Sequence, residues 1–377
     1  MQKNYLLKLI GTFSLITLFT ILSCNSSDDE YTAVSPVHLD LTKVPYPKLS
    51  DYKFFKGDIK NLTPVLGVLP YEPASSLFSD YAHKKRFVWM PDGVKATYNG
   101  DGKALEMPVG SALIKNFFYE HVQPSNTTKL IETRIMIRKA TGWIFANYVW
   151  NDEQTEALLD LNGSYKDITW TNENSSVMNV NYRIPSEVQC ITCHKTKEII
   201  NNTEQIVHIP IGIKPQNLNF NYNYGSEVKN QLTKWIEAGY LENNFTLPSA
   251  TNTTVNYEDT SKSIDLRARS YVDINCAHCH TDNKHCDYRP MRFAFSQTGG
   301  TNGNNNMGVC INTQDMQGFP STLAKIVAPG NINKSMLHYR INTTNETYRM
   351  PLHGRTLIHT EGVALMEEWI NSLSPCQ

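Results

Sequence analysis

Two short segments of this chain have residues at the spacing needed to bind a haem group covalently. The segments at residues 190–194 and 276–280 both read Cys-x-x-Cys-His. Two cysteines three positions apart share one face of a helical turn, so both thiols can bond to one porphyrin, and the next histidine can bind its iron. The motifs therefore predict two covalently attached haem c groups. The predicted attachment residues and proximal iron ligands are Cys190, Cys193, His194, Cys276, Cys279 and His280.

The same residue types also serve other chemistry. Zinc knuckles and redox-active dithiols use paired cysteines, and a chance match is the third alternative. A thioredoxin-like dithiol would need a surrounding βαβ pattern, which the flanking sequence lacks. Zinc ribbons usually place their two cysteine pairs much closer together than residues 190 and 276. The spacing therefore favours haem attachment.

The first 30 residues have the features of a bacterial lipoprotein signal. Lys3 and Lys8 precede an apolar run over residues 9–22, which is short for a membrane-spanning helix. The segment ending at Cys24 resembles a lipobox, in which residues 1–23 are cleaved and Cys24 is lipidated. An ordinary signal peptide with a stray cysteine is the alternative. We therefore expect an exported protein held at the membrane by its lipid, facing the periplasm or displayed on the surface of the outer membrane.

The cysteines outside the motifs predict a disulfide. Of eight cysteines, one is the lipidation candidate and four belong to the motifs, which leaves Cys286, Cys310 and Cys376. Disulfides are expected in an exported protein. Cys286 with Cys310 is the simplest pair, because both border a polar segment rich in Gly and Asn at residues 297–307. Cys376 would then be a free thiol, or it would displace one of the other two.

Hydrophobic periodicity predicts an α+β multidomain fold that begins with an antiparallel β domain. A polar tether at residues 24–60 precedes this domain, which we place at residues 61–180. Its clearest signal is the alternation over residues 131–138, followed by a turn and a second extended stretch at 143–150, which together predict a hairpin. Four tryptophans are expected to pack in its core rather than around a cofactor. They are Trp89, Trp143, Trp150 and Trp170.

The two motifs are expected in tandem, mainly α-helical haem units at residues 181–250 and 251–377. A capping box at residues 186–189 begins a helix that carries the first motif, and an amphipathic pattern over 264–272 leads into the second. Each motif is followed by another helical pattern with a Trp-Ile pair, at residues 228–241 and 361–373. This arrangement resembles class I cytochrome c, in which the attachment helix packs against a terminal helix.

The resemblance to class I cytochrome c also implies the distal iron ligands. Met350 stands in a Met-Pro step shortly before the last helical pattern, where such cytochromes have their ligand methionine. Met336 is its competitor, although it fits an apolar helical pattern. No methionine lies between His194 and Trp235, so the first haem either lacks a distal ligand or takes His208. Lower-ranked candidates are Met178, His83 and His121.

Over most of its mature length the chain resembles a family of diheme c-type cytochrome lipoproteins of Gram-negative bacteria. The matching segments are residues 77–82, 108–110, 131–134, 210–214, 273–280 and 361–365. The segment at residues 285–290 departs from the family, which has a more Gly-rich pattern there, and this bears on the pairing of Cys286. The resemblance implies two haem groups that carry electrons.

We expect an electron-transfer protein rather than a self-contained enzyme, with redox partner proteins in the cell envelope. One alternative is a diheme enzyme of the peroxidase type with an open first haem. Another is a binding module, in which the β domain captures a partner and the haem part relays electrons. The net charge of −1 gives no electrostatic basis for binding nucleic acid.

Overall fold

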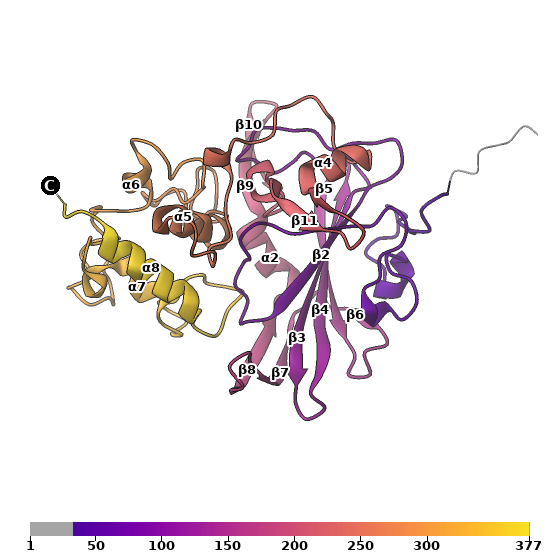
Figure 1. Cartoon of the computed structure of the whole chain (residues 1–377), viewed down its shortest axis with the longest axis horizontal. Coiled ribbons are helices and arrows are strands. Elements are labelled where there is room, and N and C mark those ends of the chain that lie inside the picture. The colour runs from indigo at the N-terminus through magenta and orange to yellow at the C-terminus, as the bar shows by residue number, and fades with distance from the viewer. Residues whose placement is uncertain (1–32, 377) are drawn as a thin grey trace, which may run out of the picture. The chain divides into compact units, whose positions relative to one another are not determined.

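An eight-stranded antiparallel sheet forms the centre of the molecule (Figure 1). The structure is a computed structural model that describes residues 33–376, and one compact unit begins at Pro36. Strands β1 to β6 neighbour one another in chain order, β7 pairs with β3, and β8 pairs with β7. The strands are β1 (Leu69–Tyr71), β2 (His83–Trp89), β3 (Ala112–Val122), β4 (Thr127–Lys139), β5 (Gly142–Trp150), β6 (Ala157–Leu159), β7 (Ser164–Thr171) and β8 (Val177–Ile184).

The hairpin predicted from the alternating pattern is confirmed as β4 and β5. Glu132 stands opposite Val149, and the register runs without interruption to Lys139 opposite Gly142. Ile135 and Ile137 bury their side chains on one face of this hairpin, as β-branched residues on a pleated surface favour. All four tryptophans expected in the core are buried.

One face of the sheet packs against the segment that precedes it. Residues 37–65 include the 3₁₀ helices η1 (Leu49–Tyr52) and η2 (Ile59–Asn61) and supply apolar side chains to a shared core. Tyr52 is fully buried there, and its hydroxyl lies 2.8 Å from that of Tyr148 on β5. This face of the sheet therefore packs into an apolar core, in which the buried hydroxyls of Tyr52 and Tyr148 are hydrogen-bonded to each other.

The opposite face has two apolar clusters at its ends. Val88 and Leu113 join residues from the 213–241 region, including Trp235, in one cluster. Phe117 joins residues of β7 and β8 in the other. The elements beyond β8 on this side are α2 (Glu187–His194), β9 (Lys195–Ile200), β10 (Thr203–His208), α3 (Pro215–Leu218), β11 (Asn221–Asn223), β12 (Val228–Asn230) and α4 (Gln231–Glu237).

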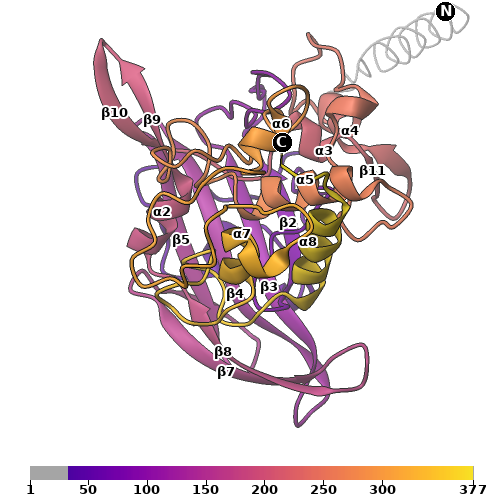
Figure 2. The same ribbon diagram turned by 90° about the vertical axis from the view of Figure 1, so that its left-hand side faces the viewer.

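The C-terminal part of the chain, residues 251–376, forms a second layer built mostly of loops. In Figure 2 its helices lie in front of the sheet strands. The 13-residue α8 packs on α5 around the buried Trp369. The helices of this layer are η3 (Ala250–Asn252, at its border), α5 (Ile264–Asn275), α6 (Gly303–Asn306), η4 (Ile332–Lys334), α7 (Met336–Ile341) and α8 (Thr360–Ser372).

A buried carboxylate joins the two layers. Asp80, in the loop before β2, accepts hydrogen bonds from the backbone N–H groups of Thr356 (2.7 Å) and Leu357 (2.8 Å) and from the Thr356 hydroxyl (2.9 Å). A second link is the ion pair between Lys214 and Asp273 on α5, with Nζ and Oδ1 2.5 Å apart. Specific polar contacts therefore position the C-terminal layer on the sheet.

The predicted fold class of a β domain followed by mainly α-helical tandem haem units is wrong. Only 19% of the structure is helical, and four of the seven α-helices in residues 33–376 reach seven residues. The first predicted unit fails for a clear reason: α2 ends at His194 and continues directly into the β9–β10 hairpin. The second helix expected for that unit is the short α4, whose Trp235 packs into the sheet cluster.

Candidate metal centre

The second Cys-x-x-Cys-His segment follows the end of α5 and lines a cavity. Cys276 caps the helix, and its N–H donates to the carbonyl of Val272 (2.9 Å). The N–H groups of Cys279 and His280 then donate to the Cys276 carbonyl, which winds the segment into tight turns. As a result Cys276, Cys279 and His280 all line a cavity of about 450 Å³.

The first segment lies on α2, as its capping box predicts, but its residues separate. Ser186 and Gln189 form the box at the helix start. Cys193 lines the same cavity as the second segment. Cys190 instead lies near Arg134 and Asn147 of the sheet, and burial raises the pKa of its thiol. The two motifs therefore share one cavity through Cys193.

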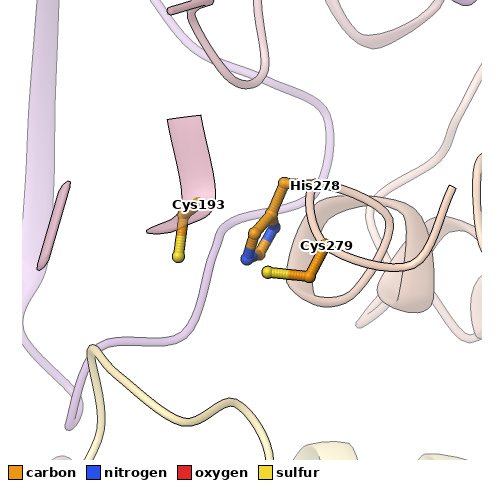
Figure 3. A group of neighbouring side chains, drawn as sticks. All are labelled: Cys193, His278 and Cys279. Atoms are coloured by element: carbon orange, nitrogen blue, oxygen red, sulfur yellow. The ribbon is translucent and has the colours of Figure 1, made fainter. Parts of the chain in front are cut away.

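Three potential metal ligands converge at this point. An imidazole nitrogen of His278 and the sulfur atoms of Cys193 and Cys279 all lie within 4.8 Å of one another. Figure 3 shows the three side chains approaching one another from α2 and from the turn after α5. Two thiols and an imidazole are ligands that zinc, copper and iron share.

The electrostatics of this triad favour one thiolate. Hydrogen bonds from the Cys279 thiol and from His278 hold the pKa of Cys193 well below its usual range, although burial acts in the opposite direction. The pKa of Cys279 is raised, chiefly by its hydrogen bond to Cys193 and by burial. Burial also raises the pKa of Cys276 to about 12. Cys193 is therefore the thiol of the triad that ionises most readily, and a thiolate is both the nucleophilic and the metal-binding form of cysteine.

Three imidazole nitrogens around the triad have no hydrogen-bond partner among the described residues. They are the buried Nδ1 atoms of His278, His280 and His353. All three residues line the cavity, and so does Met350, the predicted distal ligand. Burial lowers the pKa of His280 to about 4, so its ring is neutral near pH 7. Buried polar atoms normally have hydrogen-bond partners. Several buried nitrogen atoms without partners around one cavity therefore indicate a site for a ligand or ion.

The other histidines predicted as ligands lie elsewhere. The Nδ1 atom of His194 is 2.8 Å from the carbonyl oxygen of Ile209, and burial lowers the pKa of its ring to about 4. The Nδ1 atom of His208 is 3.2 Å from the carbonyl oxygen of Trp143. Both rings pack beside Phe145, with centroids 5.1 and 5.2 Å from its ring. Neither His194 nor His208 lines the cavity.

The predicted disulfide between Cys286 and Cys310 is wrong. Cys310 is bonded to Cys376 instead, with Cα atoms 5.7 Å apart, and Cys286 is a buried free thiol that lines the cavity. Proximity in the sequence suggested the wrong partner, because the chain end returns to Cys310 after α8. The predicted lipidation site, Cys24, lies outside the described residues.

The prediction of two covalently attached haem groups is corrected together with the fold. It assumed two separate helical units, each with its own motif. The observed structure is rich in β-strand and unlike a cytochrome, so it does not support two such groups. The two motifs instead meet at one cavity, where Cys193 lies against Cys279 and His278.

Comparison with known proteins gives no relative: no protein family, curated protein or solved structure matches this chain. The resemblance to diheme c-type cytochrome lipoproteins with a class I cytochrome c-like C-terminal domain is therefore also corrected, since the molecule is mostly antiparallel sheet. Among residues 33–376, no helix combines the length and the hydrophobicity that crossing a membrane requires.

Sequence reasoning missed two residues of this site. His278 occupies a variable position of the second motif, and its presence there was the one available signal. The sequence contained no signal for His353, because this residue follows Met350 in a loop whose path the sequence does not determine. Neither residue had been assigned a role.

Proposed function

We propose that this protein binds one transition-metal ion through Cys193, His278 and Cys279 and that this centre transfers electrons. The convergence of these three donor atoms from two distant segments carries the proposal. Thiolate and imidazole donors suit copper, iron and zinc, and of these copper and iron change oxidation state by one electron. The metal would accept one electron from a donor protein and pass it to an acceptor.

The surroundings of the triad support a functional rather than a purely structural metal. Structural zinc sites use four protein ligands, whereas three ligands and a cavity leave a coordination position open. Met350 and His353 line that cavity and offer further sulfur and nitrogen donors. His280 is held neutral by burial, which is the form that binds metals.

The proposed place of action is the cell envelope, with redox proteins there as partners. The disulfide between Cys310 and Cys376 supports an oxidising compartment. The lipobox-like sequence before Cys24 supports export and a lipid anchor. Replacing Cys24 with Ala should release the protein from the membrane fraction, and retention in that fraction would refute the anchor.

Metal analysis of the exported protein tests the centre. We expect about one copper or iron ion per chain, a reversible one-electron signal in voltammetry, and loss of both in Cys193→Ser, since one of three ligands is removed. Cys286→Ser is the matched control, because Cys286 lines the same cavity outside the triad. Equal metal content in both variants would refute the site. If intact mass spectrometry showed a covalently bound tetrapyrrole, the proposed metal centre would be refuted.

The contact between the Cys193 and Cys279 thiols favours a second candidate, a redox dithiol. The two cysteines would form a disulfide by losing two electrons and two protons to a disulfide-containing partner. The lowered pKa of Cys193 suits this attack. In metal-free protein, loss of two titratable thiols on oxidation, with Cys193 and Cys279 joined in one peptide, would favour this candidate over the metal centre.

A further inference from the structure

Three basic side chains stand in a row across the sheet. Arg86 on β2 pairs in register with Lys115 on β3, and Lys115 pairs with Arg134 on β4. Directly opposite residues of antiparallel strands point to the same face of a sheet. This is the face whose ends are covered by the two apolar clusters, because Val88 and Leu113 flank the row on one side and Phe117 on the other. The row therefore lies between two apolar clusters.

Helix α2 covers one end of this row. Asn147 stands opposite Arg134 in the register, and its Nδ2 donates to the carbonyl of Pro185, just before α2 (2.6 Å). Phe145, on the same face of β5, contacts the ring of His194 at the end of α2. The basic row thus faces the segment that carries the first motif.

The positive charge of the row exceeds its counterions. Arg134 is satisfied by the buried Glu132, with Nε and Oε2 2.9 Å apart. Arg86 is 6% exposed, its Nη1 atom has no hydrogen-bond partner, and its nearest carboxylate oxygen, on Glu72, is 3.8 Å away. Within the described part of the chain, Lys115 forms no ion pair, and neither does its neighbour Lys84. The four cations Lys84, Arg86, Lys115 and Arg134 therefore have only two buried carboxylates near them, Glu132 and Asp80, and Asp80 also binds the backbone at Thr356 and Leu357.

Such an arrangement is costly unless something negative joins it. Like charges directly opposite each other destabilise a strand pair, and a buried charge needs a partner. Burial lowers the pKa of Lys84 to about 7, and burial together with Arg86 and Arg134 holds the pKa of Lys115 well below its usual range. The side chains are thus poised to bind an anion, which would restore their full charge.

We infer that Arg86, Lys115 and Lys84 form a binding site for an oxyanion, a carboxylate or phosphate group, on the sheet face between the two apolar clusters. The unpartnered Nη1 of Arg86 supplies a fixed donor, and the two lysines supply flexible ones. The site uses none of the three residues of the candidate metal centre. The inference therefore goes beyond the proposed function, and the two can be tested independently.

Anion binding to the full mature chain tests this site. The probes are inorganic phosphate and citrate, titrated by calorimetry and thermal unfolding at constant ionic strength, with chloride as the reference anion. We expect at least one probe to raise the melting temperature of the wild type more than chloride does, because an anion bound only by the folded state stabilises it. A response to phosphate alone would indicate a phosphate ligand, and a response to citrate alone would indicate a carboxylate ligand.

Two matched lysine variants test whether the anion binds at the proposed site. Lys115→Met should weaken binding of the probe by roughly tenfold or more, since a charge-assisted contact from a half-buried side chain is lost. It should still fold, because Lys115 is half-buried and its Nζ contacts the Phe117 ring (4.7 Å to the centroid) rather than a carboxylate, so an apolar side chain is tolerated there. Lys85→Met changes an exposed residue of the neighbouring strand β2, between Lys84 and Arg86, and should leave binding unchanged. Equal probe affinity in the two variants, or no response beyond chloride in the wild type, would overturn the inference.

Discussion

The sheet and the C-terminal layer are stabilised in different ways. Strands β2 to β5 are joined by long ladders, with register shifts only near the far end of the β3–β4 pair, and one face of the sheet closes on a large apolar core. Residues 251–376 have a smaller core around α5 and α8 and depend on the Cys310–Cys376 disulfide and on the contacts of Asp80. Regular backbone pairing provides the rigid support, whereas the irregular layer supplies most of the sulfur and nitrogen donors of the cavity. The two regions should therefore respond differently to mutation, reduction and acid.

The largest effect is expected from the core of the sheet. Trp150 is fully buried, and its Nε1 donates to the Thr133 hydroxyl (3.0 Å). Trp150→Ala should lower the free energy of unfolding by about 3–5 kcal/mol, because it leaves a cavity and removes one of the two hydrogen bonds of the Thr133 hydroxyl. Urea unfolding followed by circular dichroism measures this. Tyr165→Ala on β7, at a side chain that is 57% exposed, is the control and should change stability by less than about 0.5 kcal/mol. Similar losses in both variants would contradict this assignment of the core.

Reduction of the disulfide should affect the C-terminal layer alone. The bond joins residues 66 positions apart, and closing a loop of that length contributes up to roughly 4 kcal/mol in the chain-entropy model. Cys376→Ser should therefore increase hydrogen exchange in residues 310–376 while the sheet amides keep their protection. Cys286→Ser, at a free thiol, should leave exchange at those residues unchanged. Faster exchange throughout the sheet in Cys376→Ser would show that the two regions are not separable.

Acid should open the same layer through His359. Its ring is buried, stacked on Phe78 at a centroid distance of 4.2 Å, and burial lowers its pKa to about 4. An unfolded histidine has a pKa near 6.5, so the unfolded chain binds the proton first and stability falls as pH decreases from about 6.5 to about 4. The loss is on the order of 3 kcal/mol. Unfolding titrations across this pH range measure it.

The variant His359→Gln serves as the control for the acid effect, because its side chain does not titrate. Its stability should vary less with pH over that range than the stability of the wild type. Nearby charges that act on the ring are Glu361, Lys84 and Arg355. An unchanged pH dependence in His359→Gln would assign the acid response to another group.

The smallest effect is expected where the two regions meet. Asp80→Asn keeps one acceptor oxygen but turns an amide NH₂ toward backbone N–H groups, which should cost about 1–2 kcal/mol. The amides of Thr356 and Leu357 should then exchange faster, as measured by NMR. Asp92→Asn, in the loop after β2, is a suitable reference, since Asp92 is exposed. Unchanged exchange at Thr356 would show that the carboxylate does not hold the layers together.

Local patterns in the sequence predicted several elements well. The β4–β5 hairpin and helices α2, α5 and α8 lie where alternation, capping and helical periodicity indicated. The alternation over residues 131–138 places Glu132 on the polar side of the strand, yet Glu132 is fully buried. Periodicity identifies one apolar face of a strand, and it cannot show that a second layer will cover the other face.

The site was less predictable because it depends on contacts between distant segments. The motifs themselves were visible, but not that Cys193 would meet His278 and Cys279 at one cavity. The helical pattern at residues 228–241 indicated a second helix for a haem unit. Its Trp235 instead contacts Tyr71 of the sheet, at a ring distance of 5.7 Å. An amphipathic pattern shows that a helix needs a partner, but it does not identify that partner.

The bonds of Asp80 to Thr356 also bear on how the chain acquires its structure. These partners are 276 positions apart, so Asp80 cannot obtain them until the chain has been made as far as Thr356. Pairings between remote segments slow folding, because the chain loses entropy before the contacts form. The sheet can assemble early from its neighbouring hairpins, and docking of the final segment onto Asp80 is then the late step. During that interval the unfinished cavity and its thiols are exposed to the surroundings.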